Sequence, residues 1–280
     1  RLKKLRFFYR MKNMMKEKVA KDINILASFC GKRDLPELTQ KALEDKYSLK
    51  QADVMVLFDG SILAGGNILA QAMFANIAKI YVIVGGAGHT TDTLRQVVAK
   101  EYPKIETQTL SKAEIFNAYL KEKYNLAADY LECRSTNCGN NITYLLGLLE
   151  QEKIDCQSII FCHDATMQER MDAGLRKYLS KEKKIINFAA YHAEVVVKEG
   201  QFGFKQQIHG MWEMERYISL LMGEIPRLTD NAAGYGPKGK NNIAHVEIPT
   251  EVRIAFEALK QDYADLIRLA NPLYASVDEK

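Results

Sequence analysis

From residue 52 onward the chain alternates between short apolar runs and longer segments in which apolar residues recur every three or four positions. Short runs rich in β-branched residues are typical of buried strands, and the longer period is typical of helices that pack along one face. Strands and helices in this alternation predict a parallel sheet with crossover helices. The expected fold class is therefore α/β.

The same pattern places the individual elements. Strands are expected at 53–58, 80–84, 129–133, 158–162 and 184–188. Helices are expected at 67–78, from near 91, at 111–124, around 142–149 and at 167–178. The helix at 111–124 begins with Ser111, and Glu114 three residues later completes a predicted capping box.

After residue 190 the alternation of strands and helices stops. The elements expected there are a helix around 211–222, a Gly/Pro-rich loop at 230–242 and a long final helix that opens near Pro249. The pattern divides the chain into a basic segment at 1–22, an α/β domain at 23–190, and a helical extension at 191–280 packed on that domain.

The charge is distributed unevenly. The 280 residues carry a net charge of +4, but the first 22 hold nine basic and two acidic residues, so the remainder is slightly acidic. A body with that balance gives no reason to expect nucleic acid as a partner. Met11, Met14 and Met15 stand among the N-terminal lysines. This segment predicts either a solvated basic helix against the body or an amphipathic helix that makes peripheral contact with a membrane surface or a partner.

Other sequence features bound the class of protein. No apolar run approaches the roughly 20 residues of a membrane span, so no transmembrane segment is expected. The five cysteines are odd in number and lack CxxC spacing, which argues against a disulfide framework and a zinc ribbon. Reduced thiols in a cytoplasmic protein are expected. His163 and Asp164 lack further ligands at suitable spacing, so no metal is expected.

Candidate chemistry lies in the loops that follow the strands, because open parallel sheets bind ligands beyond the carboxyl ends of their strands. In the loop 85–90 the glycines allow close approach to a ligand, and the next helix N-terminus favours an anion. The spacing is not GxGxxG, and a tight strand-to-helix turn is the alternative. Asp59 has Leu57, not a carboxylate, two residues before it, which disfavours an aspartyl-phosphate mechanism.

The loop 135–141 consists of polar or small residues, more than one helix cap requires. Such side chains suit a ribose, an amide or a carboxylate, and Glu132 can accept hydrogen bonds from ribose hydroxyls. An elaborate helix cap is the alternative interpretation.

Several of these motifs, in this order, resemble the YdcF-like branch of the SanA/ElyC/YdcF domain family. They are the segments 85–91, 132 with 135–141, 164–170, 225–228, 234–240 and 245–247. The resemblance covers roughly residues 20–268. It implies a Rossmann-like α/β domain with a helical C-terminal extension, and S-adenosylmethionine as ligand, with no established reaction.

The loop chemistry and the resemblance together predict a binding site for this nucleoside-type ligand. Gly86 and Gly88 are expected to cradle its carboxylate, and Glu132 or the polar loop to bind its ribose or amino groups. The full set of expected cofactor-binding residues is Gly60, Gly85, Gly86, Gly88, His89, Thr90, Glu132, Ser135, Thr136, Asn137, Asn141, Asp164, Thr166, Met167 and Arg170.

The chain also departs from the family pattern. Asn140 stands where relatives usually have Glu, and Thr166 and Glu169 replace a frequent His-x-x-Arg element, with Arg170 the nearby cation. No catalytic residue is therefore assigned, and the chain is better equipped to bind than to catalyse.

Three functions follow as expectations. The first is S-adenosylmethionine binding, with a methyltransferase-like role open. The second is an enzyme acting on a phosphorylated or cell-envelope metabolite, with Arg227, Lys238 and Lys240 meeting a phosphate near Tyr235. The third is a membrane-surface or protein-interaction module built on the basic N-terminus. The sequence assigns no oligomeric state.

Overall fold

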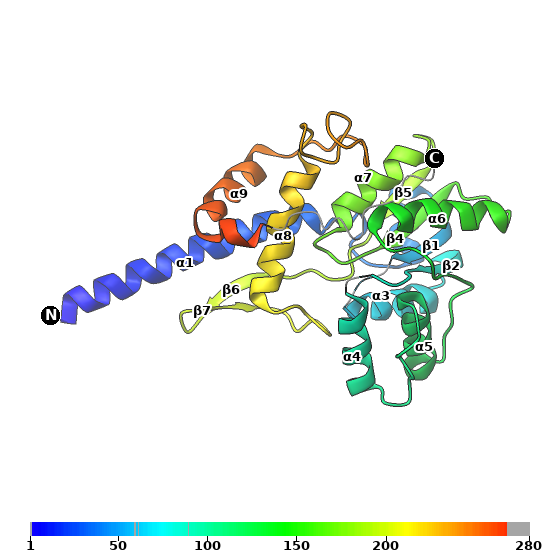
Figure 1. Cartoon of the computed structure of the whole chain (residues 1–280), viewed down its shortest axis with the longest axis horizontal. Coiled ribbons are helices and arrows are strands. Elements are labelled where there is room, and N and C mark those ends of the chain that lie inside the picture. Colours follow the sequence, from blue (N-terminus) through cyan, green and yellow to red (C-terminus); the bar gives the residue numbers. More distant parts are fainter. Residues whose placement is uncertain (1, 59, 61, 89, 268–280) are drawn as a thin grey trace.

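The protein is built on a five-stranded parallel sheet in the order β3-β2-β1-β4-β5 (Figure 1). A computed structural model describes residues 2–58, 60, 62–88 and 90–267, and of residues 2–13 it describes the backbone. The strands are β1 (Ala52–Phe58), β2 (Ala78–Val84), β3 (Tyr130–Glu132), β4 (Ser158–Cys162) and β5 (Lys184–Asn187). The expected α/β fold class is confirmed, and the sheet is Rossmann-like.

The central strand β1 is buried on both faces, which explains its uninterrupted apolar sequence. Val54, Val56 and Phe58 face one hydrophobic cluster, while Met55 and Leu57 belong to the other. Alternate residues of a strand point to opposite sides, so helices are needed on both faces of this sheet.

Helices α3 (Ala64–Phe74), α4 (Thr91–Glu101) and α5 (Lys112–Tyr124) supply the cluster that contains Met55 and Leu57. The predicted capping box at the start of α5 is present, with Ser111 and Glu114 each bonded to the other's backbone. Helices α6 (Cys138–Gln151) and α7 (Gln168–Tyr178) cover the opposite face.

Two features near the start of the sheet differ from expectation. The helix expected at 67–78 runs from Ala64 to Phe74, and Asn76, with a φ of 50°, helps to form the turn into β2. A short helix, α2 (Gln40–Tyr47), precedes the sheet and was not predicted. It is capped by Thr39, whose side chain accepts a hydrogen bond from the Ala42 N–H at 3.2 Å.

The C-terminal extension contains helices α8 (Met214–Leu228) and α9 (Thr250–Tyr263), followed by a 3₁₀ turn η1 (Ala264–Leu266). It also contains an antiparallel hairpin, β6 (Val195–Lys198) and β7 (Gln201–Phe204), that the sequence analysis did not predict. The two turn residues Glu199 and Gly200 have φ of 52° and 75°. Positive φ at both positions is the geometry of a type I′ hairpin turn.

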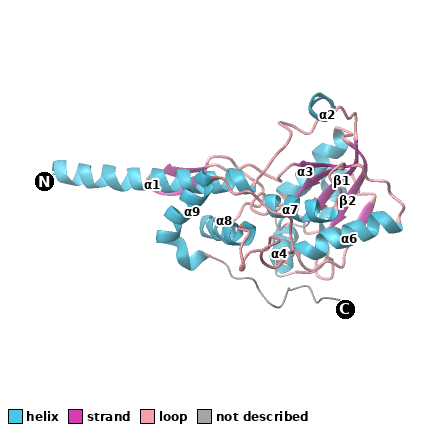
Figure 2. Cartoon of the chain, turned by 90° about the horizontal axis from the view of Figure 1, so that it is seen from above, coloured by secondary structure: helices cyan, strands magenta, loops and turns pink. Residues whose placement is uncertain are grey.

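Helix α1 (Leu2–Cys30) is a single helix of 29 residues. Its first turns project away from the rest of the molecule, and its second half lies beside α8, α9 and β6 (Figures 1 and 2). Ile23, Leu26 and Cys30 are fully buried there. The basic segment expected at 1–22 is therefore the outer part of a helix that continues into the body.

The C-terminal end of α1 lies against the loop that follows β4. A Cβ atom built on Gly31 would lie 3.3 Å from the Cβ of Ala165 and 2.9 Å from the Ala27 carbonyl oxygen. The prohibitive contact is the one with the Ala27 carbonyl of α1 itself, and the loop after β4 adds a second tight contact, so glycine suits this position. No helix in the described part of the chain combines the length and the apolar composition needed to cross a bilayer.

A buried ion pair joins the α/β domain to the extension. Arg170 in α7 donates from Nε to Glu224 Oε2 at 2.6 Å and from an Nη atom to Glu224 Oε1 at 3.0 Å. The side chains are 13% and 4% exposed. A two-pronged contact of this kind fixes both the distance and the orientation of α8 on α7.

We expect Glu224→Ala to lower the free energy of unfolding by about 3–5 kcal/mol, because it leaves the buried Arg170 charge without a partner. The double variant Arg170→Met, Glu224→Leu should recover most of this loss, since it removes both charges and fills similar volume. Urea unfolding of the single and double variants measures the difference. A loss below about 1 kcal/mol in Glu224→Ala would show that the pair does not hold the extension.

Candidate functional site

The candidate site lies at the carboxyl edge of the sheet, where the loops after the five strands meet. From β1 the sheet continues through β2 to β3 on one side and through β4 to β5 on the other. The change of direction between β1 and β4 is the topological switch point, the usual ligand site of such sheets. Of the residues singled out in the sequence, Asp59 and His89 lie outside the described residues.

Asp164, in the loop after β4, is the centre of the first cluster. Its Oδ1 accepts hydrogen bonds from the Thr166 N–H at 2.9 Å, from Thr166 Oγ1 at 2.7 Å and from Tyr191 Oη at 2.7 Å. Its Oδ2 accepts from Trp212 Nε1 at 2.8 Å. The side chain is buried, and all four partners are donors, as an acceptor-only carboxylate requires.

This cluster brings together three separate parts of the chain: the loop after β4, the segment after β5 and the segment before α8. Tyr191 and Trp212 were not identified from the sequence. The available signal was that Trp212 is the single tryptophan of the chain. Burial and the neighbouring Asp164 carboxylate raise the pKa of the Tyr191 hydroxyl well above its ordinary value, so Tyr191 stays a donor at neutral pH.

The Trp212 ring is the partly exposed member of the cluster. The Arg216 guanidinium lies 5.7 Å from the centre of the ring. Gly60, in the loop after β1, is next to the cluster, because a Cβ built on it would lie 4.0 Å from Asp164 Cβ. The switch point therefore presents an aromatic ring whose indole N–H is anchored by a buried carboxylate.

The glycine loop after β2 packs on the polar loop after β3. The Gly86 N–H donates to Ser135 Oγ at 3.1 Å, and the Gly85 N–H to the Glu132 carbonyl at 2.8 Å. A Cβ on Gly86 would lie 2.3 Å from the Ser135 carbonyl oxygen. Glycine at 86 is thus required by the contact between the loops. An anion bound by the Gly86 N–H would have to take the place of Ser135 Oγ as its acceptor. The cradle that Gly86 and Gly88 are expected to form for the ligand carboxylate stays a prediction.

The rest of the glycine loop starts helix α4. The Gly88 N–H donates to Thr91 Oγ1 at 2.8 Å, so this N–H also has a partner inside the protein. Thr90 occupies the N-cap position of α4, without a capping bond from its side chain.

The polar loop after β3 is organised by its own side chains. Glu132 accepts from the Arg134 N–H at 2.7 Å and from the Ser135 N–H at 3.2 Å, one on each carboxylate oxygen. Asn137 caps α6 by accepting from the Asn140 N–H at 2.9 Å. These contacts are those expected if the loop 135–141 is an elaborate helix cap. The hydrogen bond between Glu132 and a ribose stays a prediction.

Four other residues of the expected site lie in the loops after β3 and β4 or in the helices that follow these loops. Thr136 Oγ1 donates to Asn140 Oδ1 at 3.2 Å on the surface, and Asn141 is buried in the first turn of α6. Met167 is half-buried at the N-cap position of α7. Arg170, one turn further along, is engaged by Glu224. Burial opposes its charge, but Cys138 and Glu224 raise its pKa further above the ordinary value.

A charged cluster on α7 contains two acidic residues that sequence analysis did not assign. Asp172 contacts Arg176 at 2.7 Å and Lys32 at 3.3 Å, and Glu169 contacts Arg176 at 3.4 Å. Burial is the main cause that raises the pKa of Glu169 to about 7; Asp172 raises it further, and Lys32 and Arg176 oppose the rise. Asp34 also faces the cluster through Asn187.

The loop at 230–245 is folded around Asp230. This carboxylate accepts from the Lys238 N–H at 2.8 Å and pairs with His245 Nδ1 at 2.8 Å. The Lys238 N–H and then His245 lower the pKa of Asp230, and the bond to Asp230 raises the pKa of His245. Next to this pair, the Tyr235 ring has Lys240 Nζ 5.0 Å and Arg227 Cζ 6.0 Å from its centre.

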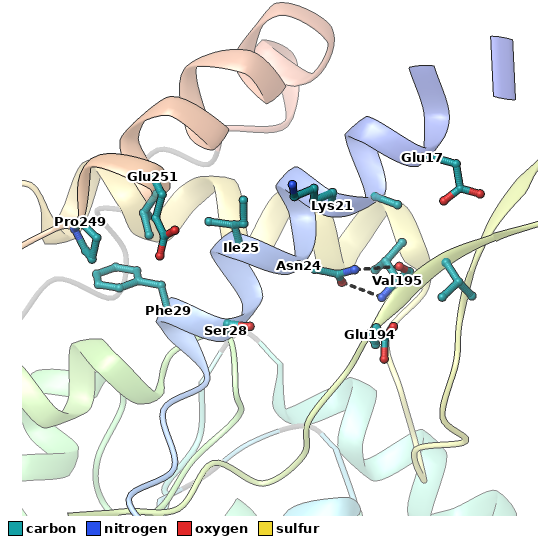
Figure 3. Close-up of a pocket in the computed structure, with 13 residues that line it drawn as sticks. Glu17, Lys21, Asn24, Ile25, Ser28, Phe29, Glu194, Val195, Pro249 and Glu251 are labelled. Carbon is teal, nitrogen blue, oxygen red and sulfur yellow. Dashed lines mark hydrogen bonds between the residues drawn. The ribbon is translucent and has the colours of Figure 1, made fainter. Parts of the chain in front are cut away.

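A groove of about 600 Å³ lies away from the strand edge, between α1, β6 and the start of α9 (Figure 3). Asn24 joins two of its walls, because its amide exchanges hydrogen bonds of 2.8 and 2.7 Å with the Val195 backbone. Glu17, Glu194 and Glu251 make the lining acidic apart from Lys21. None of the expected site residues lines this groove.

The five cysteines, all among the described residues, are thiols and form no disulfide. Burial raises the pKa of Cys162 to about 12 and that of Cys156 to about 11, so these thiols are protonated at neutral pH. Within the described residues, no group of three or more His, Cys, Asp or Glu side chains is arranged to hold a metal ion.

Comparison with known protein families yields no matching family model. The resemblance to the YdcF-like branch therefore rests on the motifs quoted above.

The charged cluster on α7 predicts a pH-dependent stability. The pKa of the Glu169 carboxyl is near 4.5 in the unfolded protein and about 7 in the folded protein. The folded state therefore holds this proton more tightly, and the resulting contribution to the free energy of unfolding is fully present below about pH 4.5 and is lost as the pH rises through 7. Relative to Glu169→Gln, the native protein should lose on the order of 3 kcal/mol between about pH 5 and 8. Urea unfolding at several pH values measures this, with the exposed Glu257→Gln as control. Parallel pH profiles for native protein and Glu169→Gln would refute it.

Gly86→Ala should lower the free energy of unfolding by about 3 kcal/mol, the upper end of the cost of overpacking, because the new methyl group meets backbone atoms. Gly147→Ala in α6 is the matched control, since nothing lies within 4 Å of its built Cβ. That change should instead stabilise the helix by about 0.5–1 kcal/mol. Equal effects of the two changes in denaturant unfolding would show that the two loops are not in tight contact.

Proposed function

We propose that the protein binds S-adenosylmethionine, or a related adenosyl nucleoside, at the switch point between β1 and β4. Membership of the YdcF-like branch is part of this proposal. The observation that carries it is the Trp212 ring, which Asp164 holds at 2.8 Å through the indole N–H at the strand edge. A fixed, partly exposed aromatic ring at this place provides a surface on which a planar base can stack.

The loop after β1 also contributes to the proposed site. Gly60 leaves space for the backbone to approach a ligand closely beside Asp164. Asp164 is itself buried, so its role is to position Trp212 rather than to contact the base.

The proposal is one of binding, with no reaction assigned. Two charged side chains of the expected site, Glu132 and Arg170, already have partners inside the protein. Both Glu132 oxygens accept backbone N–H groups, and Arg170 donates to Glu224. A methyl-transfer role needs a second substrate beside the adenosyl ligand.

The single tryptophan gives a direct test. Titration with S-adenosylmethionine or S-adenosylhomocysteine should produce a saturable change in Trp212 fluorescence, together with a rise in unfolding temperature. Ligand at about 100 times its Kd adds about 2.7 kcal/mol to the stability of the folded state. A dinucleotide and a nucleotide sugar, titrated in the same way, should produce neither change.

Variants connect the signal to the site. Asp164→Asn should weaken binding by about tenfold or more, because the amide presents an N–H₂ where the carboxylate accepts, and Trp212 loses its anchor. The exposed Asp262→Asn is the control and should bind as the native protein does. Absence of any fluorescence or thermal change with millimolar S-adenosylmethionine would overturn the proposal.

A second candidate function is supported by the cluster of Arg227, Lys238 and Lys240 around Tyr235. Arg227, in the last turn of α8, and Lys240 both lie near the Tyr235 ring, and Asp230 holds the loop that carries Lys238 and Lys240. Basic side chains on a folded loop suit a phosphorylated metabolite. In the same thermal assay, stabilisation by a sugar phosphate but not by S-adenosylmethionine would favour this function and displace the first.

A further inference from the structure

The outer part of α1 differs in charge from the rest of the protein. The first 16 residues contain seven Lys or Arg, and the first acidic residue is Glu17. Within this one helix the charged residues are therefore all basic before Glu17 and of both signs from Glu17 onward. The groove beside the inner part of α1 has the opposite sign, with Glu17, Glu194 and Glu251 in its lining.

The structure separates the same two parts of α1. Among the described side chains, contact with the body begins at Lys16, which donates to the Gly200 carbonyl and lies 6.0 Å from the Phe202 ring centre. From Met14 onward, where side chains are described, Ala20 is the first buried residue. Before them, Met14 and Met15 are 64% and 67% exposed. The helix backbone continues outward to Leu2, beyond the other elements (Figure 2).

The composition of the outer part distinguishes between polyanionic partners. Eight of the first 15 residues are apolar: Leu2, Leu5, Phe7, Phe8, Tyr9, Met11, Met14 and Met15. Nucleic acid would engage the basic residues through its phosphates. An anionic lipid surface offers the same charge and also an acyl region into which apolar side chains of a basic helix can be buried.

We propose that the outer part of α1, residues 2–15, is a surface that docks on anionic lipid. Charge complementarity brings the helix to the headgroups, and its apolar residues, including the exposed Met14 and Met15, enter the interface. The helix lies on the membrane and does not cross it. This docking is independent of the ligand proposed for the strand edge.

Vesicle co-sedimentation of the full chain tests the proposal. The protein should pellet with vesicles of phosphatidylcholine mixed with phosphatidylglycerol, should stay in solution with phosphatidylcholine alone, and should be released by high salt. The variant Lys3→Gln, Lys4→Gln, Arg6→Gln should lower the partition coefficient by about a hundredfold, because each basic residue at an anionic surface contributes about fivefold.

Two further variants separate charge from burial. Met14→Gln, Met15→Gln keeps every charge, and it should still lower partitioning by about tenfold if these side chains enter the interface. Lys50→Gln, Lys100→Gln, Lys181→Gln removes three exposed charges from the body and should leave partitioning unchanged. Circular dichroism and the unfolding temperature verify that each variant is folded.

The outcomes are decisive in both directions. Selective binding to anionic vesicles that is lost in both N-terminal variants supports the proposal. Equal binding to neutral vesicles, no binding to either kind, or unchanged binding in the N-terminal variants overturns it. Binding to a short RNA without binding to vesicles would assign the surface to nucleic acid. A dimer in size exclusion that the methionine changes abolish, without vesicle binding, would assign it to a second copy.

Discussion

The hydrogen bonds of Asp164 are the interaction on which the arrangement of the strand edge depends. One buried carboxylate accepts from Thr166 on its own loop, from Tyr191 after β5 and from Trp212 before α8. Loss of any donor leaves a buried charge under-satisfied, so the three segments are held together as a set. The Arg170–Glu224 pair makes a second connection of this kind in the first turn of α7, where a side chain of the α/β domain again contacts one of the extension.

Elements with strong periodicity could be predicted from the sequence, because burial on one or two faces imposes the pattern directly. The strand at 158–162 and the capping box at Ser111 were located to the residue. The hairpin at β6 and β7 was missed because each strand has four residues and the turn pair Glu199–Gly200 is not one of the Asn-Gly or Asp-Gly pairs that signal a hairpin in a sequence. Residues 67–78 were placed too late along the chain, since the first turn of α3 is made of Ala64, Gly65 and Gly66, which carry little periodic signal.

The strand edge could be predicted as a region but not as a set of contacts. Parallel strands place their following loops together whatever the side chains, so the loops containing Gly86, Ser135 and Asp164 were correctly sought at one edge. The contacts inside that edge depend on residues more than 20 positions away in the sequence, such as Tyr191 and Trp212. No local pattern predicts a pairing of that kind. For the same reason, Glu224 could not be predicted from the sequence as the partner of Arg170, which lies 54 positions away.

Helix α1 spans about 43 Å from end to end, given the rise of 1.5 Å per residue. Gly31, which follows the last turn, lies beside Ala165, the residue after Asp164, because a Cβ built on Gly31 would be 3.3 Å from Ala165 Cβ. The helix therefore has one end outside the body and the other beside the loop of Asp164. Between its two ends Ile23 and Leu26 are fully buried, so one continuous helix joins the exposed outer part of the chain to the carboxyl edge of the sheet.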